Sequence, residues 1–459
     1  MSFLADLPTK KIAVIGGGVT GTALIQFLLG KGSEVTFFDE TEISFGELKS
    51  QQFLDSKAHF DFAIVSPGWK RTHPLLQDFL AKKIQIMGEL DFSWKIKQES
   101  APSQRWVALT GTNGKTTAIQ MLESIMVAAG VHGKACGNVG DSVISMLDRS
   151  EHYEILALEL SSFQSEWNDL PVFDAVAILN IAPDHIDWHG SFDEYANAKI
   201  KLLERTSCAV LNLDDPEIAT RSSSFSGKKV FFTLSTPQPG ELGLVEDLLI
   251  DRAFSPDPNQ ADFFAELADI KPTVPHNISN AMSAAGLALA LGISHGDIQS
   301  GLQQFEVDHH RLELVLHHQE IGWVDDSKAT NPHAAAAALK SFLSVIWIAG
   351  GLAKGASMDA LVEQSAKRLK AAILIGQDRE LIAQALARYA PHVPIYRIDK
   401  TGSVSGFMSA IVDQALALAQ PGDTVLLAPA CASMDQFRNY SQRGDSFKTA
   451  VLQGVPDEQ

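Results

Sequence analysis

Short apolar runs alternate with stretches of helical spacing along most of the chain. This alternation is typical of α/β proteins, in which each buried strand is followed by a helix and then by the next parallel strand. In the first hundred residues we expect strands at Lys11–Ile15, Glu34–Phe38 and Phe62–Val65. The later strand candidates are Trp106–Leu109, Ile155–Leu160, Ala175–Ile181, Ala209–Leu213, Val230–Leu234, Val345–Ala349, Ala371–Ile375, Pro394–Ile398 and Thr424–Ala428. The pattern predicts mostly parallel, doubly wound sheets.

Two interruptions divide the chain into three expected domains. Residues 98–104 are polar, contain a proline and precede the strand at Trp106, so they are typical of a linker. Near residue 310 the alternation of strands and helices starts again. We therefore expect an N-terminal Rossmann-like domain at residues 1–101, a central phosphate-loop ATPase domain with a parallel sheet at 102–307, and a C-terminal Rossmann-like α/β domain at 308–459.

A glycine loop with a lysine separates the strand at Trp106–Leu109 from a helix that resumes apolar spacing at Ala118. In such a loop, backbone N–H groups and the helix N-terminus surround phosphate oxygens, and the lysine contacts the terminal phosphates. The full pattern G-x-x-x-x-G-K-[ST] would place a glycine where this chain has Leu109. Gly111 supplies the turn instead, and Thr116 offers the hydroxyl that usually binds Mg²⁺. The sequence predicts a nucleotide site.

A second glycine loop, Gly16–Gly21, has the pattern G-x-G-x-x-G between a strand and a helix. Asp39 ends the next strand, where dinucleotide-binding folds place a ribose-binding carboxylate. This arrangement suits NAD, and it also suits any nucleoside diphosphate. The turn Ser66–Trp69 either lines the same crevice or is an ordinary surface turn.

Charged and polar residues follow the central strands. Glu159 lies at the carboxyl end of one strand, as a Mg²⁺ ligand or as a solvated acid. The segment Asn180–His189 follows the next strand with two histidines and two acids, which indicates metal or phosphate contacts at His185. Lys199 lies on a helix, where a lysine is normally a solvated charge. Asn277 either contacts a purine edge or caps the helix that follows.

Composition limits the possible partners. The 459 residues carry a formal charge of −18, which argues against nucleic acid or an anionic membrane as the main partner. Three cysteines lie far apart, as in a reduced cytosolic protein, and no apolar run approaches the 18 residues that a membrane span needs. We expect a cytoplasmic enzyme with no membrane insertion.

The polar segments together resemble a known family. They are, in chain order, Gly-Thr-Asn-Gly-Lys-Thr-Thr from Gly111, Glu-Leu-Ser-Ser-Phe-Gln from Glu159, Asp-His-Ile-Asp-Trp-His-Gly from Asp184, His-Asn-Ile-Ser-Asn from His276, His310-Arg311, Asp-Ser-Lys-Ala-Thr-Asn from Asp326, and Ser-Met-Asp-Gln-Phe from Ser433. This set is similar to the Mur ligases of peptidoglycan synthesis. The resemblance covers all three expected domains, and the segments Asp326–Asn331 and Ala430–Gly444 are most similar to the members that add D-glutamate.

The resemblance implies a reaction and its site residues. ATP would phosphorylate the carboxylate of UDP-N-acetylmuramoyl-L-alanine, and the D-glutamate amine would attack the acyl phosphate, with two Mg²⁺ as cofactors and a monomeric enzyme. The implied catalytic residues are Lys115, His185 and Lys199, the last as a carbamylated lysine. The implied metal ligands are Thr116, Glu159, His185 and Lys199.

The implied substrate contacts fall into three groups. Those of ATP are Gly111, Thr112, Asn113, Gly114, Lys115, Thr116, Thr117, Asn277, Arg311, Asp326 and Lys328. Those of the UDP-sugar are Val19, Thr20, Asp39, Ser66, Gly68 and Asn138, so the resemblance favours UDP over NAD for the first glycine loop. Those of D-glutamate are Thr330, Lys354, Ser433 and Tyr440, where Tyr440 stands in place of a phenylalanine common in relatives.

Other enzyme classes stay open from the sequence. They are another Mur ligase, a folylpolyglutamate synthase-like ligase, another phosphate-loop NTPase or kinase, and an NAD oxidoreductase. The folylpolyglutamate enzymes lack a separate glycine-loop domain ahead of the phosphate loop, whereas this chain has about a hundred residues there. The hypothesis of an NAD oxidoreductase rests on the glycine loop Gly16–Gly21 alone.

Overall fold

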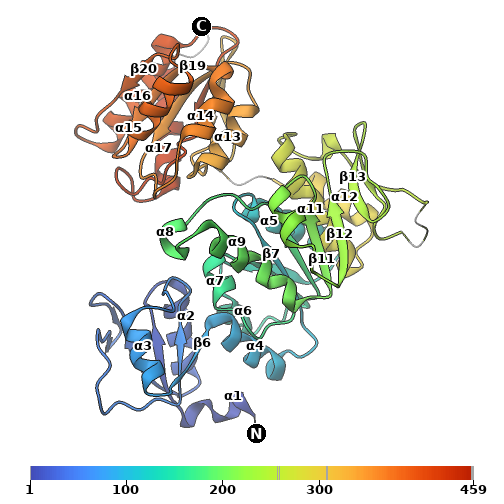
Figure 1. The fold of residues 1–459 in the computed structure, drawn as a ribbon, viewed down its shortest axis with the longest axis vertical. Coiled ribbons are helices and arrows are strands. Elements are labelled where there is room, and N and C mark those ends of the chain that lie inside the picture. The colour runs from blue at the N-terminus through green and yellow to red at the C-terminus, as the bar shows by residue number, and fades with distance from the viewer. Residues whose placement is uncertain (1, 256, 258, 307–308, 456–459) are drawn as a thin grey trace. The chain divides into compact units, whose positions relative to one another are not determined.

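A computed structural model describes residues 2–255, 257, 259–306 and 309–455 of the chain (Figure 1). It contains two compact units: residues 1–181 with 193–305, and residues 182–192 with 306–459. The domain boundary expected between residues 307 and 308 lies outside the described residues. Across the described part, the mixed α/β class with mostly parallel sheets is confirmed. No described helix is long and apolar enough to cross a membrane.

The first unit begins with a small parallel sheet in the strand order β2-β1-β5-β6. Its strands are β1 (Lys11–Ile15), β2 (Glu34–Phe38), β5 (Phe62–Val65) and β6 (Gln85–Gly88), with the hairpin β3 (Ser44–Phe45) and β4 (Leu48–Lys49) beside them. The helices are α1 (Phe3–Asp6), α2 (Val19–Gly30), α3 (Pro74–Ala81) and α4 (Glu89–Ser100). Apolar residues of α2 and α4 pack on one face and those of α3 on the other. The connections after β1 and β5 thus leave on opposite faces, which opens a crevice at the carboxyl ends of these two strands.

The same unit contains a nine-stranded sheet in the order β15-β14-β13-β12-β11-β10-β7-β9-β8. Its parallel strands are β7 (Arg105–Thr110), β8 (Gly133–Gly137), β9 (Ile155–Glu159), β10 (Ala175–Ile178), β11 (Cys208–Asn212), β12 (Lys228–Phe232) and β13 (Glu241–Val245). The antiparallel edge is β14 (Leu248–Asp251) and β15 (Asp262–Glu266). Its helices are α5 (Lys115–Ala128), α6 (Val143–Leu147), α7 (Ser162–Glu166), α9 (Phe192–Ile200), α10 (Pro216–Arg221), α11 (Pro275–Leu291) and α12 (His295–Gln304). The apolar core joins this sheet to α5, α11 and α12.

The second unit has a six-stranded sheet in the order β16-β17-β21-β18-β19-β20, parallel except for the pair β16 and β17. The strands are β16 (Glu313–His318), β17 (Ile321–Asp325), β18 (Val345–Gly350), β19 (Leu369–Ile375), β20 (Ile395–Arg397) and β21 (Thr424–Leu427). The helices are α8 (Ile186–His189), α13 (Pro332–Lys340), α14 (Asp359–Ser365), α15 (Arg379–Tyr389), α16 (Val404–Leu418) and α17 (Tyr440–Gly454). Helices α13–α15 cover one face, and α16 and α17 cover the other.

The expected strands are all present, with ends that shift by a few residues. Strand β10 stops at Ile178, three residues before its expected end. The sequence did not predict β6, β8 or the strands β13–β17, which are short or carry many polar residues. The helix expected from Ala118 begins at Lys115, which places the lysine in its first turn.

Candidate active site

The phosphate-loop candidate connects α5 to β7, which lies between β10 and β9 in the nine-stranded sheet. Gly114 has a φ of +81° and is the N-cap of α5, where a glycine supplies no capping side chain. A Cβ on Gly114 would lie 2.2 Å from Asn280 Oδ1, so only glycine fits there. The N-terminus of α5 and the helix dipole give this loop the partial positive charge that favours an anion.

A partner that the sequence analysis left unassigned holds this loop. Asn180 accepts a hydrogen bond from Asn113 N at 2.8 Å through Oδ1 and donates to Asn113 O at 3.0 Å through Nδ2. Thr112 N donates to Asn180 O at 2.9 Å. The end of β10 therefore fixes the loop conformation. Its signal was an amide residue directly after a buried strand.

Two lysines donate to one carbonyl oxygen of the loop. Lys115 Nζ lies 2.9 Å from Gly111 O and 2.9 Å from Thr112 O. Lys199 Nζ lies 2.8 Å from the same Gly111 O and 3.5 Å from Thr110 Oγ1. Two ammonium groups this close repel each other, which favours an anion beside them.

Lys199 is buried, with 1% of its surface exposed, so the alternative that it is an ordinary solvated charge is wrong. Its ammonium lies 4.7 Å from the ring centroid of Tyr195. The Tyr195 hydroxyl is 2.8 Å from Thr112 Oγ1. Helix α9 thus brings Lys199 and Tyr195 against the phosphate loop.

Glu159, at the carboxyl end of β9, is also buried, with 1% exposed. Its Oε1 accepts a hydrogen bond from Asn138 Nδ2 at 2.8 Å, whereas its Oε2 is buried without a partner. This Oε2 has no partner among the described residues. Because burying an unpaired carboxylate oxygen is costly, such an oxygen is suited to a hard cation. The contact also joins Asn138, expected at the sugar-diphosphate end, to an expected metal ligand. The solvated-acid alternative is wrong.

The first glycine loop lies at the crevice between β1 and β5. Asp39 Oδ2 accepts from Gly17 N at 2.7 Å, and its Oδ1 accepts from Thr41 N at 3.1 Å. Ser66 is buried and donates to Gly16 O at 3.1 Å, so the turn after β5 is part of the crevice wall. Val19 is 78% exposed in the first turn of α2. Thr20 is half-buried beside it, and Gly68 is exposed at the tip of the turn after β5.

Asn277 is buried on α11 and its side-chain amide has backbone partners. Its Nδ2 donates to Lys271 O at 3.2 Å and to Pro272 O at 3.1 Å. The amide hydrogens that would meet a purine are engaged with the chain preceding α11.

In the second unit, Arg311 and Asp326 lie near each other. Asp326 Oδ1 accepts from Leu312 N at 3.2 Å, and loss of hydration raises the pKa of this carboxyl to about 8, against the opposing effects of that bond and of Arg311. Arg311 Nε is buried without a hydrogen-bond partner. An orphaned guanidinium nitrogen is suited to a phosphate or another anion.

Backbone hydrogen bonds join the three loops that carry the expected D-glutamate residues. Ala430 N donates to Ala329 O at 3.0 Å, which ties the loop of Thr330 to the one that leads to Ser433. Leu352 and Ala432 exchange hydrogen bonds of 2.8 and 2.9 Å, which adds the loop of Lys354. Ser433 is buried, while Lys354 is exposed and has a φ of +50°. No hydrogen bond reported for the described residues joins the three side chains directly.

His185 belongs to the second unit, in the segment 182–192. It has a left-handed backbone, with a φ of +52°, just before α8. Its N–H donates to Asp184 Oδ1 at 3.0 Å, and Asn331 Nδ2 is 3.4 Å from Asp184 Oδ2. The expected metal ligands are therefore divided: Thr116, Glu159 and Lys199 lie in the first unit, and His185 lies in the second.

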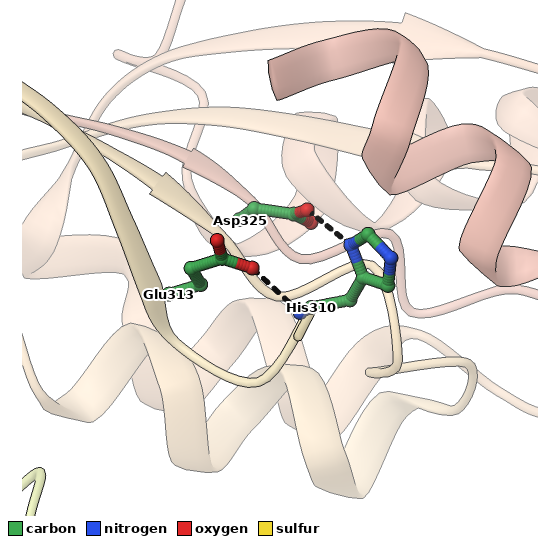
Figure 2. A group of neighbouring side chains, drawn as sticks. All are labelled: His310, Glu313 and Asp325. Atoms are coloured by element: carbon green, nitrogen blue, oxygen red, sulfur yellow. Dashed lines mark hydrogen bonds and ion pairs between the residues drawn. The ribbon is translucent and has the colours of Figure 1, made fainter. Parts of the chain in front are cut away.

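A further group of possible metal-ligating side chains, His310, Glu313 and Asp325, lies in the second unit (Figure 2). His310 Nδ1 is 2.6 Å from Asp325 Oδ2, and His310 N donates to Glu313 Oε2 at 3.1 Å. Lys448 Nζ is 2.5 Å from Glu313 Oε1. Because protein cations already pair both carboxylates, we interpret the group as an ion-pair network.

Comparisons with known proteins agree along the chain. Two family models match: the Mur ligase middle domain at residues 109–288, and the Mur ligase glutamate ligase domain at residues 310–431. A protein of Streptomyces coelicolor named UDP-N-acetylmuramoylalanine--D-glutamate ligase is 43% identical over 97% of this chain and 98% of its own length. A protein of the same name from Thermobifida fusca is 40% identical, covering 97% of this chain and 99% of its own. The solved structure of MurF from Acinetobacter baumannii, at 18% identity, shares the fold with a TM-score of 0.61 over 95% of this chain and 90% of that one.

Proposed function

Because the chain belongs to the Mur ligase family, we propose that it is an ATP-dependent ligase that adds D-glutamate to UDP-N-acetylmuramoyl-L-alanine in the synthesis of peptidoglycan precursors. The observation that carries this proposal is the match of almost the whole chain, at 43% identity, to a ligase of that name. The phosphate loop and the orphaned oxygen of Glu159 supply the chemistry that such a ligase needs.

The reaction has two steps. The γ-phosphoryl group of ATP moves to the carboxylate of the UDP-sugar substrate, which breaks the bond to ADP and forms an acyl phosphate. The amine of D-glutamate then attacks the acyl carbon, the amide C–N bond forms, and inorganic phosphate and a proton leave. Activation of an anionic carboxylate by an anionic nucleotide requires strong charge compensation.

The residues of the first unit supply that compensation. The N–H groups at the start of α5 and the ammonium of Lys115 bind the ATP phosphates, with Gly111, Thr112, Asn113, Gly114, Thr116 and Thr117 forming the loop. In this proposal Lys115 leaves the carbonyl oxygens of Gly111 and Thr112 when the phosphates bind. Asn277 contacts the adenine once its amide is released.

Two Mg²⁺ ions are part of the proposal. Thr116, Glu159, Lys199 and His185 are the proposed ligands, and Lys199 takes part as a carbamate. When bound, Mg²⁺ screens the phosphate charges so that the carboxylate can approach. A carbamate would also replace one of the two cations at Gly111 O by an anion.

The remaining proposed contacts bind the UDP-sugar, the ribose and phosphates of ATP, and D-glutamate. Val19, Thr20, Asp39, Ser66 and Gly68 bind the uridine diphosphate at the crevice between β1 and β5, and Asn138 contacts the sugar-diphosphate end. In the second unit, Arg311 and Lys328 bind phosphate and Asp326 binds the ribose. Thr330, Lys354, Ser433 and Tyr440 bind D-glutamate. We also propose a cytoplasmic monomer, which agrees with the free thiols of all three cysteines.

The decisive experiment measures phosphate release with UDP-N-acetylmuramoyl-L-alanine, ATP and one amino acid at a time. We expect turnover with D-glutamate and none above background with L-alanine or diaminopimelate. L-Alanine would leave the buried polar groups of the pocket unpaired, and the second ammonium of diaminopimelate would repel Lys354. Faster turnover with either competitor would assign the chain to another ligase.

A variant tests the pocket separately. Lys354→Ala should raise the Michaelis constant for D-glutamate far more than that for ATP, because the lysine pairs with a substrate carboxylate. Lys367→Ala, an exposed lysine of the same unit, is the matched control. Equal losses for ATP and D-glutamate would show that the pocket is misassigned.

A further inference from the structure

Lys328 and Tyr440 are in direct contact in the second unit. Lys328 Nζ donates to the Tyr440 hydroxyl at 2.6 Å, and the same nitrogen lies 4.1 Å from the ring centroid. The first distance is that of a short, charge-assisted hydrogen bond, and the second is a cation–π contact. The proposed function places Lys328 on the nucleotide and Tyr440 on D-glutamate, but it gives this contact no role.

Helix α17, which begins at Tyr440, also fixes the backbone next to Lys328. Arg443, one turn after Tyr440 on α17, is 1% exposed. It donates to Ser327 O at 2.8 Å and to Ser327 Oγ at 2.9 Å. Ser327 Oγ in turn donates to Tyr440 O at 2.7 Å. With the backbone of residue 327 fixed, the main freedom left is that of the Lys328 side chain.

A lysine side chain is long and loses much rotamer entropy when a ligand fixes it. The Tyr440 hydroxyl occupies one of three ammonium hydrogens, and the ring covers one side of the charge. Among the ion pairs of the described residues Lys328 has none, so no carboxylate competes for its charge. The remaining ammonium hydrogens and the hydrogen of the phenol are suited to one anion.

We infer that Tyr440 is a positioning residue for Lys328: its hydroxyl holds the ammonium in place to bind a nucleotide phosphate. This inference rests on the proposed function, and it gives a residue of the proposed amino-acid pocket a second role toward ATP. Phenylalanine at this position would keep the ring contact and lose the hydrogen bond.

The test uses Tyr440→Phe in the full chain. The backbone contact of Tyr440 O with Ser327 is unchanged in this variant, so folding is expected to be unaffected. We expect its dissociation constant for a non-hydrolysable ATP analogue, measured by calorimetry, to rise about three- to tenfold, the factor that one hydrogen bond of typical net strength supplies. The Michaelis constant for ATP should rise by the same factor, while kcat changes less. Tyr389→Phe, a partly exposed tyrosine of α15, is the matched control.

A double-mutant cycle separates positioning from a general structural effect. If Tyr440 acts through Lys328, Tyr440→Phe should weaken analogue binding in the wild-type background and have no further effect in Lys328→Met. Unchanged analogue binding in Tyr440→Phe, or additive losses in the double variant, would overturn the inference. Neither result would contradict the proposed function. Failure of the wild-type chain to bind the analogue would overturn the proposed function and this inference together.

Discussion

At the scale of single residues, the fold holds two lysine ammonium groups close together although like charges repel each other. Lys115 and Lys199 both donate to Gly111 O, at 2.9 and 2.8 Å, so their nitrogens lie within about 6 Å of each other. Glu159 ends β9, the strand that pairs with β7, and one of its carboxylate oxygens is buried without a partner. Such an arrangement costs stability without ligands, and the phosphate and metal of the proposed site would relieve that cost.

Removal of the loop lysine tests the anion site. Lys115→Ala should lower kcat by about 10²–10³, or roughly 2.7–4 kcal/mol, because one preorganised electrostatic donor to the transferring group is lost. The circular dichroism spectrum should stay that of the wild type, since Lys115 lies in the first turn of α5 and donates to carbonyl oxygens of its own loop. Turnover near that of the wild type would contradict the phosphate-loop assignment.

The modification of Lys199 is a second prediction at this scale. We expect ¹³C-bicarbonate to give a carbamate signal in the NMR spectrum of the wild type and no such signal in Lys199→Ala. The variant should lose most activity, and formate or acetate should restore part of it by supplying oxygen ligands for Mg²⁺. Lys115→Ala should show no such rescue. Fully active enzyme without the carbamate signal would rule the modification out.

At the scale of helices and strands, the carboxyl ends of parallel strands explain how the sequence could place two of the proposed site segments at one sheet edge. Glu159 follows β9, and the loop of Gly111–Lys115 follows β7, so the alternation of apolar runs was enough to bring them to one sheet edge. The sequence could not reveal the pairing of Asn180 with Asn113, because amides after strands are common and their partners depend on tertiary packing. Arg443 was missed for the same reason, since a helical arginine is normally solvated.

The edges of the sheets were the least predictable part. Strands β14 and β15 pair antiparallel; β14 is only four residues long, and three of the five residues of β15 are half-buried or exposed, so neither has the long apolar run of a buried parallel strand. Strand β16 is similarly half-exposed and pairs antiparallel with β17. Strands β14–β16 themselves contain no residue of the proposed site, although Arg311 lies just before β16 and Asp326 just after β17.

The contact between the β16–β17 region and α17 gives a pH-dependent prediction. His310 packs beneath Gly444 of α17 and faces Asp325, Glu313, Ser441 and Asp445. The hydrogen bond that His310 Nδ1 donates to Asp325 Oδ2 raises the pKa of His310 against the effect of burial. A raised pKa means that the protonated form is favoured in the folded state. Its stabilisation is complete below the ordinary histidine value of about 6.5 and is lost as the pH rises through the folded pKa.

His310→Gln should therefore destabilise the protein most at pH 6, by about 1.5–3 kcal/mol, the usual contribution of a hydrogen bond to a charged group. The deficit relative to the wild type should shrink by pH 9. Hydrogen exchange of peptides from residues 309–455, measured at the two pH values, gives the difference. His317→Gln, at an exposed position of β16, is the control. A deficit that grows with pH would contradict the charged pair.

At the scale of the whole molecule, the proposed substrate contacts are divided between two compact units, and a ligand of one unit should stabilise that unit. The crevice between β1 and β5, with Asp39 and Ser66, lies in residues 1–181 of the first unit. A nucleotide bound there at 100 times its dissociation constant adds about 2.7 kcal/mol to the folded state. In a chain of several domains a single melting temperature would mix the units, so local hydrogen exchange is the better measurement.

We expect UDP at that concentration to slow exchange about a hundredfold for peptides of the first unit that exchange only when it unfolds, with the strongest protection at Gly16–Gly21. Peptides from residues 309–455 should exchange at unchanged rates. NAD at the same concentration should protect neither unit, because the site is proposed for a uridine diphosphate. Asp39→Asn should reduce the protection by UDP, since this carboxylate holds Gly17 N at 2.7 Å and faces the crevice. Protection by NAD and not by UDP would show that the glycine loop Gly16–Gly21 is a dinucleotide site. Protection of the second unit by UDP would show that UDP binds in that unit instead.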